Sequence, residues 1–280
     1  MAGAGSPTDA KGWAAYAAAR APATAAAAAR AVGLAVEALQ PGWVPRTALD
    51  VGSGTGSTAA AVLTRWPATS VTCLERAAAA RAVGQARVPV ASWVAGDVRT
   101  AGLRTADLVT AGYSLGELAE ADLAAVTDRL WAATGGLLLV LEPGTPRGFA
   151  TVLAVRDRLL AAGGAVASPC PHEHACPLAA AGDWCHSAVR VARSAEHRSA
   201  KGADLGWEDE KLAYVALTRL PVRRREARIV RRPVYAPRLV TLQLCGADGR
   251  ASTERIGRAS PSYRAARDAR WGDAWGPVDP

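Results

Sequence analysis

Short apolar runs alternate with helical segments through the first 165 residues of the chain. The apolar runs predict five strands, at residues 47–51, 70–75, 88–94, 106–112 and 136–142. The intervening segments predict four helices, at residues 58–66, 76–86, 118–133 and 148–162. Regular alternation of strands and helices is typical of a parallel sheet covered by helices on both faces. The pattern therefore predicts an α/β fold.

The regions on either side of this alternation follow other patterns. Residues 10–40 are rich in alanine and predict one or two helices broken near Pro22, because proline removes a helical hydrogen bond. After Gly164 the alternation stops, although residues 187–193 and 239–244 are strand-like. We therefore expect three parts: an N-terminal helical segment at 1–42, an α/β core at 43–165, and at 166–280 a Cys/His segment with a basic C-terminal part that completes the sheet.

The composition bounds the class of protein. The chain has 280 residues, half of them apolar, which suffices for one large domain or a domain with an appendage. An apolar run of about 18 residues without charges is absent, so we expect no membrane span. The first residues lack the charged start and apolar core of a signal peptide, so we expect a cytoplasmic protein in a reducing compartment, where disulfides are disfavoured. We also expect a monomer when the protein is free.

The net charge of +8 is concentrated in the last third of the chain. Residues 1–186 carry 14 basic and 14 acidic side chains, whereas residues 187–280 carry 19 basic and 11 acidic ones. The arginine stripe comprises Arg219, Arg223, Arg224, Arg225, Arg228, Arg231, Arg232 and Arg238. Arginine suits bidentate capture of phosphate, so the stripe predicts contact with nucleic acid. The candidate contact residues are Arg223, Arg224, Arg225, Arg228, Arg231 and Arg232. The alternative is a solvated surface rich in arginine.

A glycine-rich loop separates the first predicted strand of the core from its first predicted helix. It runs Asp50-Val-Gly52-Ser-Gly54-Thr-Gly56. Glycines allow a sharp turn and a close approach to a ligand, and the free amides of a helix start favour an anion or polar group. Glu75 ends the second predicted strand, where a carboxylate can accept hydrogen bonds from ribose hydroxyls. The combination predicts a nucleotide-type cofactor site, and the alternatives are a ligand-free tight turn and a surface acid.

This loop differs from a dinucleotide fingerprint, because Asp50 precedes the glycines. It resembles the first motif of Rossmann-like, S-adenosylmethionine-dependent methyltransferases. The resemblance implies that the loop wraps the methionine end of the cofactor, that Glu75 holds the ribose and that Asp97 lies near the adenine. A helix cap is the alternative role for Asp97. The candidate cofactor-binding residues are Asp50, Gly52, Ser53, Gly54, Gly56, Glu75 and Asp97.

The chemistry of a methyl acceptor is not evident in the sequence. The Asn-Pro-Pro-Tyr segment that amino-methyltransferases use after the fourth strand is replaced here by residues 111–118. Tyr113 and Glu117 are compatible with a substrate pocket and equally with packing and helix capping. Cys73 falls inside the second predicted strand, where we expect it to be a core residue. The catalytic residues are therefore unassigned.

Scarce cysteines cluster beside histidines in one window of the chain. Residues 170–186 hold three of the five cysteines and three of the four histidines. Such clusters are usually metal ligands or disulfide partners, and a reducing compartment favours a metal. The candidate ligands are Cys170, Cys176, Cys185 and Cys245, with His172, His174 and His186 as alternative ligands or as neighbours of the ligands. The cysteine spacing matches neither a zinc ribbon nor a ferredoxin run, so zinc and an iron–sulfur cluster both stay open.

Several short segments follow one another in a distinctive order along nearly the whole chain. They include Tyr16-x3-Arg20-x-Pro-x-Thr24, Leu115-Gly-Glu-Leu118, Leu141-Glu-Pro-Gly-Thr-Pro146, Pro169-Cys-Pro-His172, Asp183-Trp-Cys-His186, Trp207-Glu-Asp-Glu-Lys211 and Trp271-Gly-Asp273. In this order they resemble the methyltransferase-like family associated with the small ribosomal subunit, which includes mitochondrial methyltransferase-like protein 17 and bacterial homologues. One departure is Ser187, where the family tends to carry an aromatic residue.

The family resemblance has implications for fold, partner and cofactor. It implies a Rossmann-like methyltransferase fold and a role at small-subunit rRNA in ribosome assembly or translation. It also implies a [4Fe–4S] cluster on Cys170, Cys176, Cys185 and Cys245, which favours iron–sulfur over zinc. Two hypotheses follow. The chain is either a methyltransferase that acts on rRNA or a non-catalytic iron–sulfur assembly factor that binds rRNA and keeps a vestigial or regulatory cofactor pocket.

Overall fold

The computed structural model describes residues 7–202 and 204–278, which form two compact units. Unit 1 comprises the described residues of 1–30, 44–139 and 189–210. Unit 2 comprises the described residues of 31–43, 140–188 and 211–280. Each unit is therefore assembled from segments that lie far apart in the sequence.

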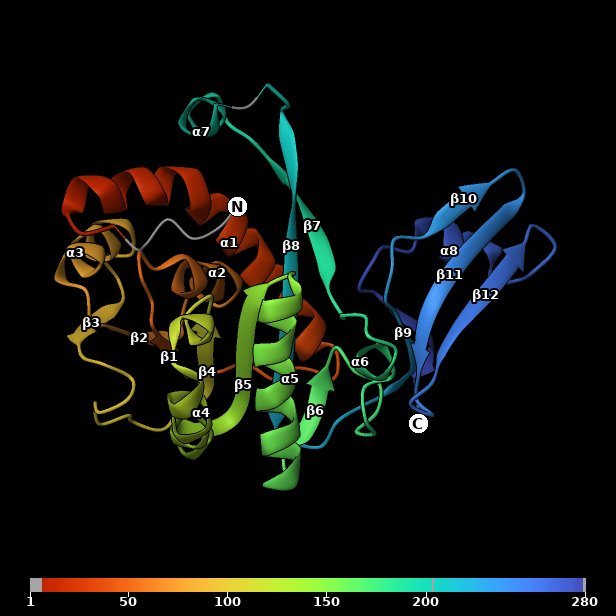
Figure 1. The fold of residues 1–280 in the computed structure, drawn as a ribbon, viewed down its shortest axis with the longest axis horizontal. Helices are drawn as coiled ribbons and strands as arrows, with labels where there is room; N and C mark the ends of the chain where they lie inside the picture. Colours follow the sequence, from red (N-terminus) through yellow and green to blue (C-terminus); the bar gives the residue numbers. More distant parts are fainter. Residues whose placement is uncertain (1–6, 203, 279–280) are drawn as a thin grey trace. The chain divides into compact units, whose positions relative to one another are not determined.

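A parallel sheet forms the centre of unit 1 (Figure 1). Its strands are β1 (Thr47–Val51), β2 (Ser70–Glu75), β3 (Ser92–Ala95), β4 (Ala106–Gly112) and the first part of β5 (Thr134–Pro143). Their order is β3-β2-β1-β4-β5, and β1 pairs in parallel with both β2 and β4. The direction of strand addition reverses between β1 and β4, and ligands of open α/β sheets bind at such a switch point. The predicted α/β fold with a Rossmann-like strand order is confirmed.

Helices connect these strands. They are α2 (Ser57–Arg65), α3 (Ala78–Arg87), the short 3-10 helix η1 (Leu115–Glu117) and α4 (Glu120–Ala133). The long helix α1 (Ala10–Val36) precedes them and continues through Pro22, so the predicted break at this proline is wrong. Ala21, Ala23 and Ala27 are buried on this helix. We attribute its continuity to this packing and to the high helix propensity of alanine.

The third strand is shorter than its apolar pattern predicts. Residues 88–91 form a turn, and pairing begins only at Ser92, so the expected strand at 88–94 is wrong in its first half. Val88 is buried although it lies outside the strand. An apolar residue can thus serve the core from a turn, and apolar pattern alone cannot separate the two cases.

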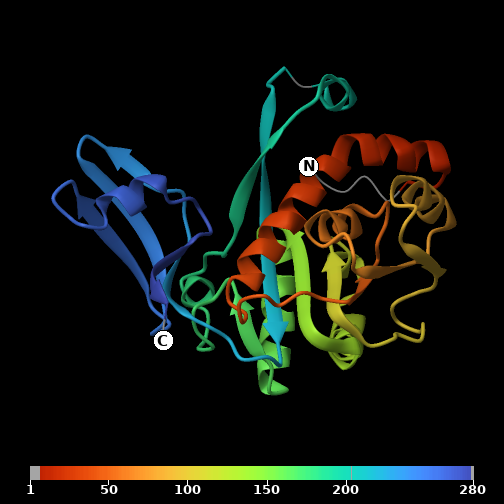
Figure 2. The ribbon, with the colours of Figure 1, turned by 180° about the vertical axis from the view of Figure 1, so that it is seen from behind.

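A two-stranded ribbon extends from unit 1 (Figures 1 and 2). It is formed by β7 (Ser187–Ala192) and the first part of β8 (Trp207–Thr218), with α7 (Ala195–Lys201) between them. The guanidinium of Arg190 stacks 3.7 Å from the Trp207 ring centroid and pairs with Asp209 at 2.8 Å. These contacts explain why an acidic segment of the sequence forms a strand: its charges are matched across the ribbon.

Unit 2 contains strands that pair side by side and a separate second sheet. The later residues of β5 and β8 lie beside β6 (Ala165–Ser168) in the order β5-β8-β6, and β8 pairs antiparallel with β6. The helix α5 (Pro146–Ala161) leads into β6 and is capped by Thr145, whose hydroxyl accepts a hydrogen bond from the Gly148 amide. The short helix α6 (Pro177–Ala180) follows β6.

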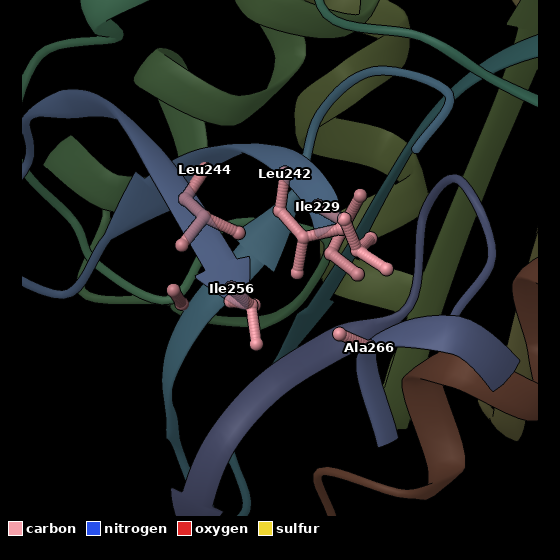
Figure 3. Packing of buried hydrophobic residues seen from close by; sticks show 7 residues of the cluster. Ile229, Leu242, Leu244, Ile256 and Ala266 are labelled. Atoms are coloured by element: carbon pink, nitrogen blue, oxygen red, sulfur yellow. The ribbon is translucent and has the colours of Figure 1, made fainter. Parts of the chain in front are cut away.

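The second sheet is antiparallel and its core is formed on one face. Its strands are β9 (Arg225–Ile229), β10 (Val234–Ala236), β11 (Leu239–Gly246), β12 (Ala251–Gly257) and β13 (Ala274–Val278). Helix α8 (Tyr263–Asp268) covers this face, and Figure 3 shows Leu242, Leu244 and Ile256 gathered there together with Ile229 and Ala266. Cys245 and Arg228, opposite each other in the register, belong to the other face.

Candidate cofactor cavity and cysteine cavity

Position 52 of the glycine loop requires glycine for two reasons. Its φ is 62°, in the left-handed region that side chains with a Cβ disfavour. A Cβ at this position would also lie 2.5 Å from the Cβ of Ser114, which follows β4. The loop between β1 and α2 is therefore held close to the end of β4, at the switch point of the sheet.

A cavity of about 450 Å³ opens at this place in unit 1. It is large enough for a cofactor or drug-sized ligand. Five of the seven predicted cofactor-binding residues line it: Gly52, Ser53, Gly54, Glu75 and Asp97. Asp50 and Gly56 belong to the same loop but are not among the lining residues. Tyr113 and Glu117, whose role the sequence left open, also line the cavity.

Glu75 fixes the shape of the loop through hydrogen bonds to two main-chain amides. One carboxylate oxygen accepts a hydrogen bond from the Gly54 amide at 2.8 Å, and the other accepts from the Ala77 amide at 2.7 Å. Glu75 is buried at the end of β2. The carboxylate is thus held at the cavity wall by main-chain donors, where it can exchange the Gly54 bond for a ligand hydroxyl.

Asp97 lies on the same cavity and pairs with Arg99. Its carboxylate accepts hydrogen bonds from the Arg99 amide at 2.9 Å and from two guanidinium nitrogens at 3.0 and 2.6 Å. These bonds lower the pKa of Asp97 to about 2. Asp97 is therefore ionised at any physiological pH.

Asp50 lies behind the loop. It is 1% exposed, and Oδ1 accepts a hydrogen bond from the Thr110 hydroxyl at 2.6 Å. Its Oδ2 is buried without a hydrogen-bond partner in the described part of the chain. Burial raises the pKa of Asp50 to about 6. Through the hydrogen bond to Thr110, Asp50 links β1 to β4 at the start of the glycine loop.

A polar cluster that the sequence did not reveal lies near Tyr113. Arg20 of α1 pairs with Glu210 of β8 at 2.8 Å, and the Tyr113 hydroxyl donates to the same carboxylate at 3.3 Å. The φ of Tyr113 is 57°, an uncommon value for a residue with a side chain. Arg20 and Glu210 are 190 positions apart, so spacing could not have linked them.

The four candidate cysteine ligands line one cavity in unit 2. Cys170 follows β6, Cys176 precedes α6, Cys185 precedes β7 and Cys245 is in β11. Burial raises the pKa of the Cys245 thiol to about 12 and that of Cys185 further still. In the described residues, no group of three or more His, Cys, Asp or Glu side chains is placed so that it could hold a metal ion, so the metal site expected from the sequence stays a prediction.

The histidines of the cysteine window differ in their surroundings. His172 is buried, and its Nε2 lies 3.2 Å from the Cys245 sulfur. His186 stacks on Trp184 and meets Trp271 edge-on. Burial lowers the pKa of both rings, so they are neutral at physiological pH. His174 is exposed. His172 is thus the histidine in direct contact with a candidate ligand.

The arginine stripe is not a uniform surface. Arg224 pairs with Glu173 and Arg231 with Asp183. Arg232 is exposed, whereas Arg228 is buried. The exposed and half-buried arginines of the stripe can therefore contact a phosphate, whereas the buried Arg228 cannot do so in this conformation.

The fold and the loop together define a Rossmann-like α/β protein with a cavity suited to a nucleotide-type cofactor. Residues 10–276 match the family described as mitochondrial small ribosomal subunit Rsm22, so the chain belongs to this family. The family resemblance found in the sequence is confirmed.

Sequence identity to an individual relative is modest. The human mitochondrial ribosome assembly protein METTL17 is 29% identical over 271 residues, which cover 85% of this chain and 57% of the relative. The chain thus spans somewhat more than half of that protein. No described helix is both long and apolar enough to cross a membrane.

Solved structures resemble the chain only weakly. The S-adenosylmethionine-bound amino pentose methyltransferase CalS10 from Micromonospora echinaspora has a TM-score of 0.41 and 20% identity, with 90% of this chain and 84% of that one covered. Magnesium protoporphyrin IX methyltransferase from Synechocystis has a TM-score of 0.41 and 12% identity, covering 68% of this chain and 74% of that one. These likenesses are too weak to say anything about chemistry.

Proposed function

We propose that the chain is an S-adenosylmethionine-dependent, methyltransferase-like protein that acts at small-subunit rRNA during ribosome assembly or translation. The observation that carries the cofactor part is the glycine loop, which with Glu75 walls a cavity at the switch point of the sheet. Membership of the Rsm22 family and the ribosome-assembly role named for METTL17 support the ribosomal part.

The residues have distinct roles in this proposal. The Gly52–Gly54 backbone receives the methionine end of the cofactor, Glu75 holds the ribose and Asp97 lies toward the adenine. The bound cofactor would supply an electrophilic methyl group. The side chains placed to meet an acceptor are Tyr113 and Glu117, which line the same cavity, and no base is assigned among them.

The Glu75→Ala variant tests the cofactor site. Calorimetry with S-adenosylmethionine should show at least a tenfold loss of affinity, because the ribose hydroxyls lose their acceptor. A matched control is Glu37→Ala, which removes a carboxylate on a different part of the chain. Unchanged binding by Glu75→Ala would remove the cofactor assignment.

A second function is supported by the cysteine cavity. In this alternative the chain is a non-catalytic iron–sulfur assembly factor that binds rRNA, and its cofactor pocket is vestigial or regulatory. Four thiols around one cavity fit the cysteine ligation of a [4Fe–4S] core. The cysteine spacing by itself leaves zinc and the cluster both open, and the family resemblance is what favours the cluster.

The two functions make opposite predictions in cells. If the protein is an enzyme, Glu75→Ala should impair small-subunit assembly as much as Cys185→Ser does. If it is a binding factor, assembly should survive Glu75→Ala and fail with Cys185→Ser. Sucrose-gradient profiles of ribosomal subunits from the two variants distinguish them.

Arginines of the stripe supply the proposed contact with rRNA. Arg223, Arg224, Arg225, Arg231 and Arg232 stay in the proposal, whereas burial removes Arg228. Each phosphate that is neutralised releases counterions, so rRNA affinity should fall steeply with salt. A flat salt dependence would exclude phosphate-dominated binding.

A further inference from the structure

Two arginines line the cysteine cavity without belonging to the candidate ligands. Arg156 comes from α5 and Arg228 from β9, and they are only 3% and 7% exposed. Arginine is almost never buried this deeply unless it is paired. Among the described residues that line the cavity, none is Asp or Glu. Two permanent positive charges therefore share one buried space with four thiols.

The hydrogen bonds of Arg228 do not neutralise it. Its Nε donates to the Pro169 carbonyl at 2.7 Å, and its two terminal nitrogens donate to the Gly272 carbonyl at 3.0 Å and the Ser168 hydroxyl at 3.4 Å. All three acceptors are uncharged. Such bonds satisfy the N–H groups, but the cost of burying the charge itself remains.

Arg156 is also incompletely compensated. One terminal nitrogen bonds Asp157 at 2.7 Å, but that carboxylate is 59% exposed, so water screens the pair. The other donates to the carbonyls of His172 and His174 at 3.3 and 2.7 Å. Its Nε is buried without a hydrogen-bond partner in the described part of the chain. Together with the Pro169 bond of Arg228, these contacts hold both guanidinium groups against the loop that carries Cys170.

A metal centre would supply the missing negative charge. Cysteines bind metal as thiolates, so four of them around a doubly charged core leave a net charge of about −2. We propose that Arg156 and Arg228 are the counter-charges of this centre, which stabilise its anionic ligand set and raise the reduction potential of the cluster. The inference rests on the metal centre proposed above.

Charge-removing and charge-retaining variants test this role. Arg156→Met and Arg228→Met keep much of the length of the side chain and remove its charge, whereas Arg156→Lys and Arg228→Lys keep the charge and lose the planar fork. Arg158→Met is the matched control, because Arg158 lies exposed on the same helix. Each protein is purified anaerobically, and its fold is checked by circular dichroism. Iron and zinc are then counted, and the midpoint potential is measured by a redox titration.

We expect each Met variant to lose at least half of its metal or to show a more negative midpoint potential, because reduction adds negative charge that is no longer offset. The Lys variants should stay near the wild type, as should Arg158→Met. For a zinc-loaded protein, zinc affinity measured by chelator competition takes the place of the potential. If a Met variant does not fold, the metal content and midpoint potential of the corresponding Lys variant are compared with those of the wild type instead.

Three results would overturn the inference in recognisably different ways. Wild-type metal content and potential in both Met variants would show that the charges do not act on the centre. Equal losses in the Met and Lys variants would show that the hydrogen-bonding fork matters and the charge does not. A wild-type protein without iron or zinc would remove the proposed metal centre itself, and this inference with it.

Discussion

The two cavities of this chain differ in how much of their key chemistry comes from one contiguous motif. The cofactor cavity of unit 1 takes part of its wall from the glycine loop and from the end of the next strand at Glu75, beside residues of α1 and of the segments 96–99 and 112–119. The cysteine cavity of unit 2 draws its four thiols from separate segments between Cys170 and Cys245. A motif made from consecutive elements, as the glycine loop and Glu75 are, can be recognised in the sequence. One made from scattered segments exists only after the unit has folded.

The charges that surround the two cavities also differ. The lining of the cofactor cavity includes Glu75, Asp97, Glu117 and Asp122, which exceed its two arginines, Arg76 and Arg99. The charged lining of the cysteine cavity comes from arginines. The first cavity therefore favours a ligand with hydroxyls and positive charge, and the second favours an anionic centre. This contrast agrees with the two different groups proposed for them.

Removal of one thiol from the cysteine cavity should have the largest effect. Cys185→Ser should abolish metal binding and lower the free energy of unfolding by on the order of 5 kcal/mol, because metal binding contributes folding energy. Metal analysis and thermal unfolding measure the two effects. The control is Cys73→Ala, which removes a buried cysteine of unit 1 and should leave the metal in place. Full metal content in Cys185→Ser would mean that the four cysteines are not a ligand set.

The loop of the first cavity should be sensitive to one methyl group. Gly52→Ala introduces a side chain at positive φ and a clash with Ser114, so we expect a loss of about 2–4 kcal/mol in stability. Affinity for S-adenosylmethionine should fall at least tenfold in calorimetry. Gly102→Ala is the control, since a Cβ there meets no atom within 4 Å. Equal affinity in the two variants would contradict the proposed role of the loop.

A smaller effect of opposite sign is expected at Asp50. Its raised pKa means that the folded protein binds a proton more tightly than the unfolded chain does. The resulting stabilisation is present below about pH 4 and is lost as the pH rises through about 6. Asp50→Asn should therefore raise stability at pH 8 by on the order of 1–3 kcal/mol and flatten the pH profile between these values. Chemical denaturation at several pH values measures this, and a variant less stable at pH 8 would refute it.

The smallest effect concerns the arginine stripe. Arg232→Met should reduce the salt slope of binding to a small-subunit rRNA fragment by about 1, as expected for one lost phosphate contact. Arg158→Met, outside the stripe, should leave the slope unchanged. Filter binding at several salt concentrations gives both slopes. An unchanged slope for Arg232→Met would exclude this residue from the interface.

Parts of the fold were predictable because they are local. The strands at 47–51, 70–75 and 106–112 have the bounds that the apolar runs predicted. Most of their buried residues are apolar, as parallel strands covered on both faces require, although Asp50, Glu75 and Thr110 are buried polar residues of the same strands. The glycine loop was equally visible, because its backbone needs glycine at fixed positions.

Other strands could not be predicted, because charged residues interrupt their apolar pattern. Strand β9 lies inside the arginine stripe, where Ala227 and Ile229 face the core while Arg228 points to the opposite face. The start of β8 looks like an acidic linker, yet its carboxylates pair with Arg190 and Arg193 of the ribbon. In both cases the partner that makes a charged residue acceptable in a strand is remote in sequence.

The sequence by itself determined the α/β class, the family, the glycine loop and the four cysteines that are candidates for a metal. Each of these depends on short-range pattern or on residue type. The tertiary structure alone decided that the cysteines surround one cavity, that Arg156 and Arg228 are buried beside them, and that Arg20 and Glu210 meet near Tyr113. The physical reason is that burial and charge pairing depend on neighbours in space, which the chain brings together only when it folds.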